Sequence, residues 1–194
     1  MKILIVDDHP LVCAALKQVI EDHFQHANVE QVFEADKALL HLAENKVDLL
    51  ILDIELDGDD GFELLNKAKL TGFEGKTIII SSKDEQLCSD IAINAGVSGY
   101  LDKKESVTRA VDAINAVLNG YTFFRSHQGR MVVKLSNQES TVLRLLLEGH
   151  TNKSVARKMD ISEKTVSTYK RRVLDKYGVK SVFNLVKHLK VISL

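Results

Sequence analysis

The sequence predicts an α/β domain with a parallel five-stranded sheet, followed by an all-α domain of four helices. Three observations support this fold class. Short apolar segments alternate with helix-like segments over residues 1–120, helical periodicity alone continues from residue 135, and the two halves differ sharply in charge. The predicted domains therefore cover residues 1–120 and 135–194, and a linker is predicted over residues 121–134, where neither periodicity is clear.

The first domain is predicted to contain five β-α units in succession. Its strands are expected over Lys2–Val6, Val29–Phe33, Val47–Leu52, Thr77–Ser81 and Ser98–Leu101. Its helices are expected over Pro10–His23, Asp36–Glu44, Gly61–Leu70, Asp84–Ala95 and Ser106–Leu118. Such alternation indicates a parallel sheet with helices on both faces, joined by right-handed crossovers.

The second domain shows helical periodicity only. Its four helices are expected over Ser136–Glu148, Thr151–Met159, Ser162–Tyr177 and Ser181–Lys190. Each begins at a serine or threonine, which are residue types that cap helices well. The short turn around Asp160-Ile161 joins the second helix to the third. Two short helices with such a turn are typical of a helix-turn-helix, whose second helix enters the major groove of DNA.

The distribution of charge differs between the two predicted domains. Residues 1–120 contain 11 Lys and Arg against 22 Asp and Glu, whereas residues 134–194 contain 13 against 5. The basic half suits a polyanion such as double-stranded DNA. On charge alone, the alternative remains that the two domains merely differ in charge and that the basic one does not bind DNA.

The remaining composition excludes several classes of protein. No run of roughly 18 apolar residues occurs, so no membrane span is expected. The apolar run at the N-terminus is too short for a signal peptide and ends in acids, so we expect a cytoplasmic protein. Cys13 and Cys88 are too few for a disulfide framework or a zinc site, and we interpret both as reduced, structural residues.

Polar side chains that can carry chemistry follow four of the five predicted strands. Asp7 and Asp8 follow the first strand, Asp53 follows the third, Ser81 ends the fourth, and Lys103 lies just past the fifth. The carboxyl ends of parallel strands meet at one edge of a sheet, so these five side chains are expected to converge there. A lone acid after a strand is more commonly a helix cap or a solvated loop residue, and only the whole set is specific.

Three carboxylates in one place repel one another unless a cation shares the site, and hard oxygen ligands suit Mg²⁺. With the charge balanced, one carboxylate can attack phosphorus and form an acyl phosphate. Asp53 follows the most apolar strand, so it is assigned as the phosphate acceptor. Lys103 can neutralise a phosphoryl oxygen, and the Ser81 hydroxyl can donate a hydrogen bond to another.

Residues 1–120 resemble a receiver domain with a flavodoxin-like fold. The matching stretches are Ile5-Val6-Asp7-Asp8-His9-Pro10, Leu52-Asp53, Asp60-Gly61, Ile80-Ser81 and Gly99-Tyr100-Leu101-Asp102-Lys103. The resemblance implies Mg²⁺ bound by Asp8, Asp53 and the main-chain carbonyl of Glu55, with Asp7 holding a metal-bound water. It also implies that Ser81 is the switch hydroxyl, that Tyr100 rotates inward on activation, and that a sensor histidine kinase or a phosphotransfer protein supplies the phosphate.

The third helix of the second domain carries the residues expected to contact DNA. Val166, Val173 and Leu174 can face the core, which leaves the polar side chains on the outside. Ser167 and Thr168 are small enough to approach base edges, and Arg171 can reach a guanine. Lys164, Thr165 and Lys170 are assigned as phosphate contacts.

Residues 135–192 resemble the LuxR-type four-helix domain. The matching stretches are Leu135-Ser136-Asn137-Gln138-Glu139, Gly149-His150-Thr151-Asn152-Lys153 and Lys164-Thr165-Val166-Ser167-Thr168-Tyr169-Lys170. With the receiver in front, the chain resembles a NarL/FixJ-type response regulator, which implies a homodimer on paired half-sites. Four residues depart from the usual pattern, because Asp57, Ser82, Gln138 and Ser154 stand where proline, alanine, arginine and glutamate are common.

We therefore expect a two-component transcription factor rather than an enzyme, in which phosphate on Asp53 controls dimerisation and sequence-specific DNA binding. One alternative is a phosphatase-like hydrolase that uses Asp53, but it leaves the basic helical half unexplained. The other is a DNA-binding protein whose receiver no longer uses phosphate, and the complete set of pocket residues disfavours it.

Overall fold

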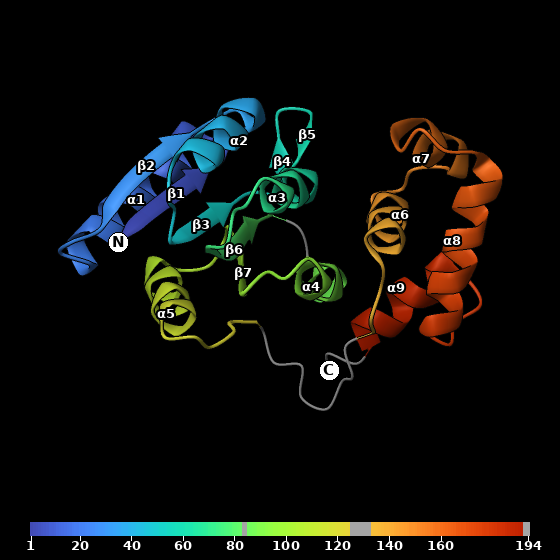
Figure 1. Ribbon diagram of the computed structural model, residues 1–194. Helices are drawn as coiled ribbons and strands as arrows, with labels where there is room; N and C mark the ends of the chain where they lie inside the picture. Colours follow the sequence, from blue (N-terminus) through green and yellow to red (C-terminus); the bar gives the residue numbers. More distant parts are fainter. Residues whose placement is uncertain (83–84, 125–132, 192–194) are drawn as a thin grey trace. The chain divides into compact units, whose positions relative to one another are not determined.

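The computed structural model describes residues 1–82, 85–124 and 133–191 (Figure 1). The chain divides into two compact units. Unit 1 consists of Met1–Glu85 and Ala95–Ser126, and unit 2 consists of Gln86–Asn94 and His127–Leu194. The domain boundaries predicted from the sequence stay a prediction, and the division differs from them in assigning residues 86–94 to unit 2. Most of the predicted linker, residues 125–132, lies outside the described residues.

Unit 1 contains the predicted five-stranded parallel sheet, in the strand order β2-β1-β3-β6-β7. The strands are β1 (Lys2–Val6), β2 (Asn28–Val32), β3 (Leu49–Leu52), β6 (Lys76–Ser81) and β7 (Gly99–Asp102). The residues of β3 are all buried, as expected of a central strand covered on both faces. The α/β fold class predicted for the first half is therefore confirmed.

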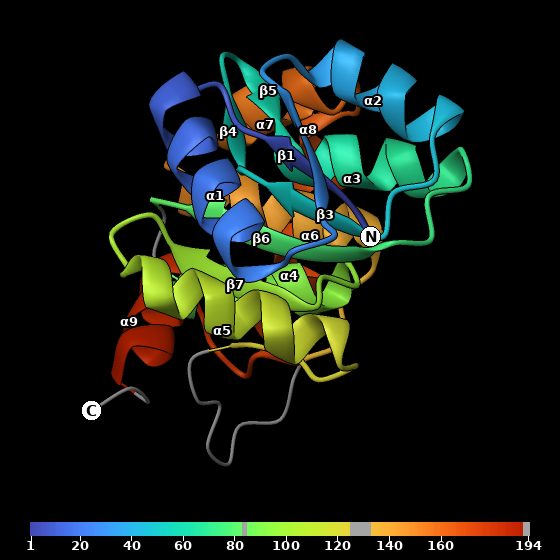
Figure 2. The same cartoon turned by 90° about the vertical axis from the view of Figure 1, so that its left-hand side faces the viewer.

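Helices cover both faces of this sheet (Figure 2). They are α1 (Pro10–His23), α2 (Ala35–Glu44), α3 (Gly61–Leu70) and α5 (Val107–Leu118). Helices α1 and α5 pack together on one face, and α2 and α3 pack together on the other. The core under α1 and α5 includes Ile5, Ile51 and Ile114, each at most 1% exposed. Full burial of such a side chain contributes roughly 1.5–3 kcal/mol, and this rigid core supports the strand ends.

A small antiparallel hairpin, which the sequence analysis missed, follows β3. It consists of β4 (Glu55–Leu56) and β5 (Asp59–Asp60). The two residues between them both have positive φ angles, 34° at Asp57 and 96° at Gly58. Positive φ at both central residues defines a type I′ turn, for which Asp-Gly is a favoured pair. A proline at position 57 could not adopt this conformation, since its ring holds φ near about −65°.

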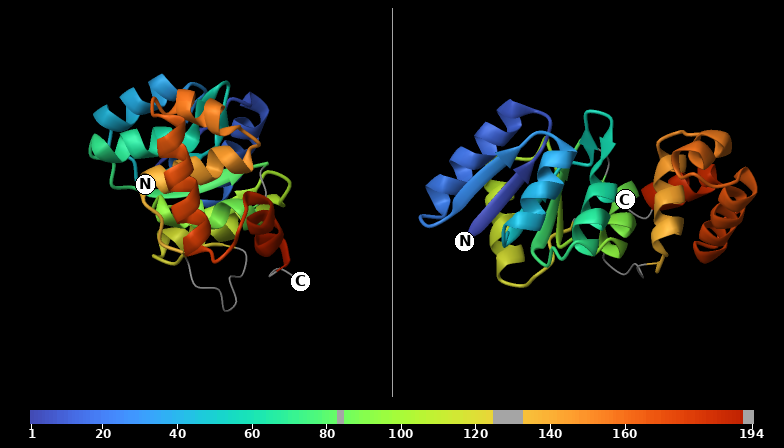
Figure 3. Two further views of the ribbon diagram at one scale, coloured as in Figure 1. Left: turned by 90° about the vertical axis from the view of Figure 1, so that its right-hand side faces the viewer. Right: turned by 45° about the horizontal axis from the view of Figure 1, so that its top comes forward.

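Unit 2 contains the predicted helices of the second half (Figure 3). They are α6 (Asn137–Leu147), α7 (Asn152–Lys158), α8 (Glu163–Lys176) and α9 (Val182–Val191). The predicted caps are confirmed, since the side chains of Ser136, Thr151, Ser162 and Ser181 accept hydrogen bonds from backbone amides in the first turns of these helices. Among the helices that the structure describes, none has the length and apolar character needed to cross a membrane.

The hydrophobic core of unit 2 lies between α6, α7 and α8. It is formed by Val142, Leu145, Val155, Ala156 and Val166. The ion pair between Lys176 Nζ and Glu139 Oε2, 2.6 Å long, connects α8 to the first turn of α6. Of the two departures from the usual pattern in this unit, Gln138 is exposed, and the Ser154 hydroxyl lies 3.3 Å from His150 Nδ1.

Unit 2 also takes in most of α4 (Glu85–Asn94), through specific hydrogen bonds. The hydroxyl of Tyr177 donates to Asp90 Oδ2 over 2.6 Å, in a buried position. The amide of Asn94 donates to the carbonyl of Val133 and accepts from the backbone N–H of Leu135, both over 2.9 Å. Buried polar groups of this kind cost stability when a partner is removed, so these bonds make α4 an integral part of the unit.

The Glu139 carboxylate gives unit 2 a pH-dependent stability. It accepts hydrogen bonds from the Ser136 backbone over 2.8 Å and from Lys176. Although burial alone would raise it, these bonds hold the pKa of Glu139 below its ordinary value. The Glu139→Gln chain is expected to be less stable than the wild type by about 1 kcal/mol at neutral pH. That difference should disappear as the pH falls through the lowered pKa.

Urea unfolding followed by circular dichroism across this pH range measures the difference. The matched control is Glu163→Gln, since Glu163 is exposed in the first turn of α8. A penalty for Glu139→Gln that stayed constant down to acid pH would contradict this explanation.

Candidate functional site

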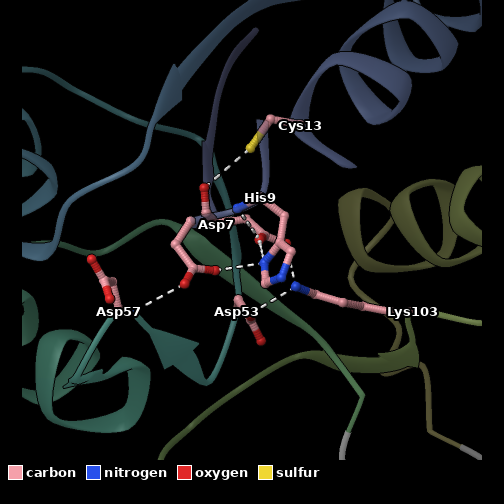
Figure 4. A network of polar contacts seen from close by, with 7 residues as sticks. Asp7, His9, Cys13, Asp53, Asp57 and Lys103 are labelled. Carbon is pink, nitrogen blue, oxygen red and sulfur yellow. Dashed lines mark hydrogen bonds and ion pairs between the residues drawn. The ribbon is translucent and has the colours of Figure 1, made fainter. Parts of the chain in front are cut away.

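The structure brings the polar strand-end residues together at one edge of the sheet. The ladder of backbone hydrogen bonds extends one residue past the strands: the N–H of Asp53 donates to the Val6 carbonyl and that of Lys103 donates to the Ser81 carbonyl, each over 2.9 Å. These bonds fix the backbones from which the functional side chains project. Figure 4 shows Asp7, Asp53 and Lys103 directed toward one another.

Lys103 connects two buried carboxylates. Its Nζ lies 2.7 Å from Asp7 Oδ2 and 2.7 Å from Asp53 Oδ2. Burial raises the pKa of the Asp53 carboxyl, and hydrogen bonds from Lys103 and from the backbone of Glu55 offset only part of that effect. Burial alone would lower the pKa of the Lys103 ammonium, but its hydrogen bonds to Asp53 and Asp7 raise it instead. The lysine therefore stays charged in the pocket.

The acidic residues form a group that fits a divalent cation. Oxygen or nitrogen atoms of Asp7, Asp8, His9 and Asp53 all lie within 4.8 Å of one another. Carboxylate oxygens are the ligands preferred by Mg²⁺, so three of these four residues offer suitable donors. The fourth residue, His9, was not predicted as part of the site, and its Nδ1 lies 2.6 Å from Asp8 Oδ1. Its position directly after the two acids was the available signal.

The hairpin after β3 contacts this group through its backbone. The N–H of Asp57 donates to Asp8 Oδ2 over 3.0 Å. Proline has no backbone N–H, so a proline at position 57 could not make this bond. Asp57 therefore changes the loop in two ways, by allowing the turn and by donating to a pocket carboxylate. Ser82, the other departure, is exposed.

Gly61, at the first residue of α3, lies directly against the Asp53 backbone. A Cβ added at Gly61 would lie 2.1 Å from the carbonyl oxygen of Asp53 and 3.0 Å from Cα of Ile54. Real Cβ atoms do not approach backbone atoms so closely, so only glycine fits here without a shift of the chain. Asp60-Gly61 is one of the stretches that resemble a receiver domain, but this contact could not be predicted from that resemblance.

Two further predicted residues lie in the interior of unit 1. The side chains of Ser81 and Tyr100 are 0% and 1% exposed, respectively. Ser81, which ends β6, is paired in register with Asp102 of β7, and Tyr100 lies two residues earlier on β7. The roles of Ser81 as a switch hydroxyl and of Tyr100 as a rotating aromatic stay predictions.

Cys13 is buried, and burial raises the pKa of its thiol to about 11, which keeps it protonated.

In unit 2, α7 and α8 form the predicted pair of helices joined by a tight turn. Asp160 lies in that turn with a φ of 52°, a conformation that Asp tolerates better than most residues. Val166, Val173 and Leu174 of α8 are buried, as predicted. The six residues assigned to DNA contact are all at least partly exposed: Lys164, Thr165, Ser167, Thr168, Lys170 and Arg171.

Two models of protein families match this chain. The model described as "Response regulator receiver domain" matches residues 3–115. The model described as "Bacterial regulatory proteins, luxR family" matches residues 133–189. The first covers most of unit 1 and all of α4, and the second covers α6, α7, α8 and most of α9.

Similar proteins span nearly the whole chain. The Fimbriae Z protein of Salmonella typhimurium is 33% identical over 203 residues, which cover 97% of this chain and 95% of that protein. The DNA-binding transcriptional activator EvgA of Escherichia coli strain K12 is 33% identical over 195 residues, covering 95% of each.

Solved structures of RcsB are also similar to the chain. One is RcsB from Salmonella enterica serovar Typhimurium bound to promoter rprA in the presence of the phosphomimetic BeF3−, which matches with a TM-score of 0.73 and 26% identity over 98% of both chains. Another, a complex of the two-component response regulator RcsB with DNA, has a TM-score of 0.75 and 25% identity, covering 97% of this chain and 98% of that one.

Proposed function

Since the chain belongs to the NarL/FixJ-type response regulators, we propose that Asp53 accepts a phosphoryl group and thereby controls dimerisation and DNA binding. The observation that supports Asp53 most directly is its position: a buried carboxylate at a strand end, 2.7 Å from the Lys103 ammonium and within reach of two further acids. The donor is a sensor histidine kinase or a phosphotransfer protein, and the reaction takes place in the cytoplasm.

The proposed metal is Mg²⁺, held by Asp8, Asp53 and the main-chain carbonyl of Glu55, with Asp7 holding a bound water. When bound, it supplies positive charge that reduces the repulsion between the carboxylates and an incoming phosphoryl group. The hairpin amide of Asp57 keeps Asp8 in position for this role. Oxygen ligands from a rigid strand edge and a hairpin support the assignment.

The transfer itself needs one nucleophile. A carboxylate oxygen of Asp53 attacks phosphorus, and the new O–P bond forms as the P–N bond to the donor histidine breaks, with its electron pair returning to the imidazole nitrogen. Lys103, already beside Asp53, then donates a hydrogen bond to a phosphoryl oxygen. Ser81 donates to another, and its movement with Tyr100 alters the surface formed by β6, β7 and the helices after them.

The DNA-binding step is assigned to α8. Its N-terminal residues enter the major groove, with Ser167, Thr168 and Arg171 near base edges. Lys164, Thr165 and Lys170 contact phosphates and position the helix. Two linked chains bind two half-sites more tightly than one, because the second binding event takes place at a high effective concentration.

This proposal predicts a change in assembly and in DNA affinity on phosphorylation. The full chain is treated with acetyl phosphate and Mg²⁺, sized by light scattering, and titrated with duplexes selected from a random pool. A dimer and a gain in affinity of more than tenfold are expected, because dimerisation links the two half-site contacts. Equal affinity with and without the phosphodonor would support the alternative in which the receiver no longer uses phosphate. Steady turnover of p-nitrophenyl phosphate would support the hydrolase instead.

A further inference from the structure

A side chain of α7 holds a side chain of α8 in place. The amide nitrogen of Asn152 donates a hydrogen bond to the hydroxyl oxygen of Ser167 over 3.1 Å. Asn152 is the first residue of α7, but the cap of that helix is supplied by Thr151, whose hydroxyl accepts from the Ser154 backbone. The Asn152 amide is therefore not needed to begin the helix. It reaches instead to a residue in the second turn of α8.

This bond determines whether the Ser167 hydroxyl acts as a hydrogen-bond donor or as an acceptor toward an external partner. A serine hydroxyl has one proton to donate and two lone pairs that can accept. Because Asn152 donates to the oxygen, the hydroxyl keeps its own proton for an external acceptor. Ser167 is exposed, so that proton can be presented at the surface of the helix.

The neighbouring hydroxyl, that of Thr168, has the opposite hydrogen-bonding role. Thr168 Oγ1 donates its proton to the carbonyl of Lys164, one turn back along α8, over 3.0 Å. Thr168 therefore offers only an acceptor to an external partner. Two adjacent hydroxyls on one helix thus present a donor at Ser167 and an acceptor at Thr168.

We propose that Asn152 is a positioning residue that makes Ser167 a hydrogen-bond donor toward DNA, and so determines which base edge the chain prefers at one position of its site. The inference rests on the proposed placement of α8 in the major groove. A donor there fits N7 of a purine, O6 of guanine or O4 of thymine, and it opposes the amino groups of cytosine and adenine, which are donors themselves.

The test compares four full-length chains: wild type, Asn152→Ala, Ser167→Ala and the double variant. The probes are the duplexes that phosphodonor-treated wild type selects from a random pool, and a panel in which each base pair is replaced in turn. Ser167→Ala is expected to reduce discrimination at one base pair by about tenfold, the usual size of one specific base contact. Asn152→Ala is expected to reduce it at the same base pair, and the double variant should lose no more than either single variant.

Lys153→Ala is the matched control, since it alters an exposed side chain next to Asn152. It should leave the pattern of base preferences unchanged, and its thermal unfolding should match that of Asn152→Ala. A loss in Asn152→Ala that is equal for every duplex overturns the inference, because it would indicate a phosphate contact or a damaged fold.

Loss of discrimination in Ser167→Ala without any change in Asn152→Ala also overturns the inference, while leaving the proposed function intact. If the wild type enriches no sequence at all, sequence-specific DNA binding fails and the inference fails with it.

Discussion

The Asp53→Asn chain is expected to take up no phosphoryl group from acetyl phosphate and Mg²⁺, whereas the wild type is modified on one residue. Asparagine keeps the shape of the side chain but lacks the carboxylate oxygen that attacks phosphorus. Intact-mass spectrometry after a fixed reaction time measures the product directly. Asp112→Asn is the matched control, because it makes the same change at an exposed position of α5 and should be phosphorylated normally.

A measurement of stability separates this loss from misfolding. Burial raises the pKa of Asp53 in the folded chain above its value in the unfolded chain. The free energy of unfolding therefore decreases as the pH rises and Asp53 ionises. Without metal, Asp53→Asn is therefore expected to be at least as stable as the wild type at neutral pH and to gain nothing at acid pH. Normal phosphorylation of Asp53→Asn would show that another residue is the acceptor.

Gly61→Ala is expected to slow phosphorylation more than tenfold, although residue 61 has no chemical group to contribute. The added Cβ would overlap the Asp53 carbonyl at 2.1 Å, so α3 or the backbone of Asp53 must move. Overpacking of this kind costs roughly 1–3 kcal/mol, and a displacement of the nucleophile by a fraction of an ångström lowers the rate of a positioned reaction. The initial rate with acetyl phosphate and the midpoint of urea unfolding are measured together.

Gly72→Ala supplies the control for stability. Gly72 has a φ of 101° with open space around it, so alanine there introduces backbone strain of about 1–2 kcal/mol but no contact with the pocket. This chain should unfold more easily and still react at the wild-type rate. An unchanged rate in Gly61→Ala would show that the Asp53 backbone tolerates the shift.

The sequence predicted the five strands of the main sheet and the helices, and it predicted that the strand-end residues converge at one edge. The helix Pro10–His23 was predicted with the bounds that the structure has, because proline and the apolar spacing mark it clearly. Placing Asp7, Asp53 and Lys103 at one edge needed only the rule that the ends of parallel strands meet. The hairpin was missed although Asp57-Gly58 carries its signal, because its two-residue strands are too short for periodicity to reveal.

Two contacts near the functional residues could not be predicted from the sequence, because they depend on how closely helices pack. The contact between Gly61 and the Asp53 carbonyl follows from how closely α3 approaches the loop after β3. The pairing of Asn152 with Ser167 follows from the packing of α7 on α8, since the two residues are 15 positions apart. A sequence shows which side chains are available, whereas these contacts are set by how the helices pack.

Because most of α4 belongs to unit 2, the DNA-binding half cannot be isolated intact by a single cut in the chain. A recombinant fragment started at residue 127, the natural choice for isolating the DNA-binding half, would omit Gln86–Asn94. The Tyr177 hydroxyl would lose Asp90, and the main chain at Val133 and Leu135 would lose the Asn94 amide. Such a truncation would expose surface that the intact protein keeps buried, so its solubility and melting behaviour would not represent those of the same helices in the whole protein.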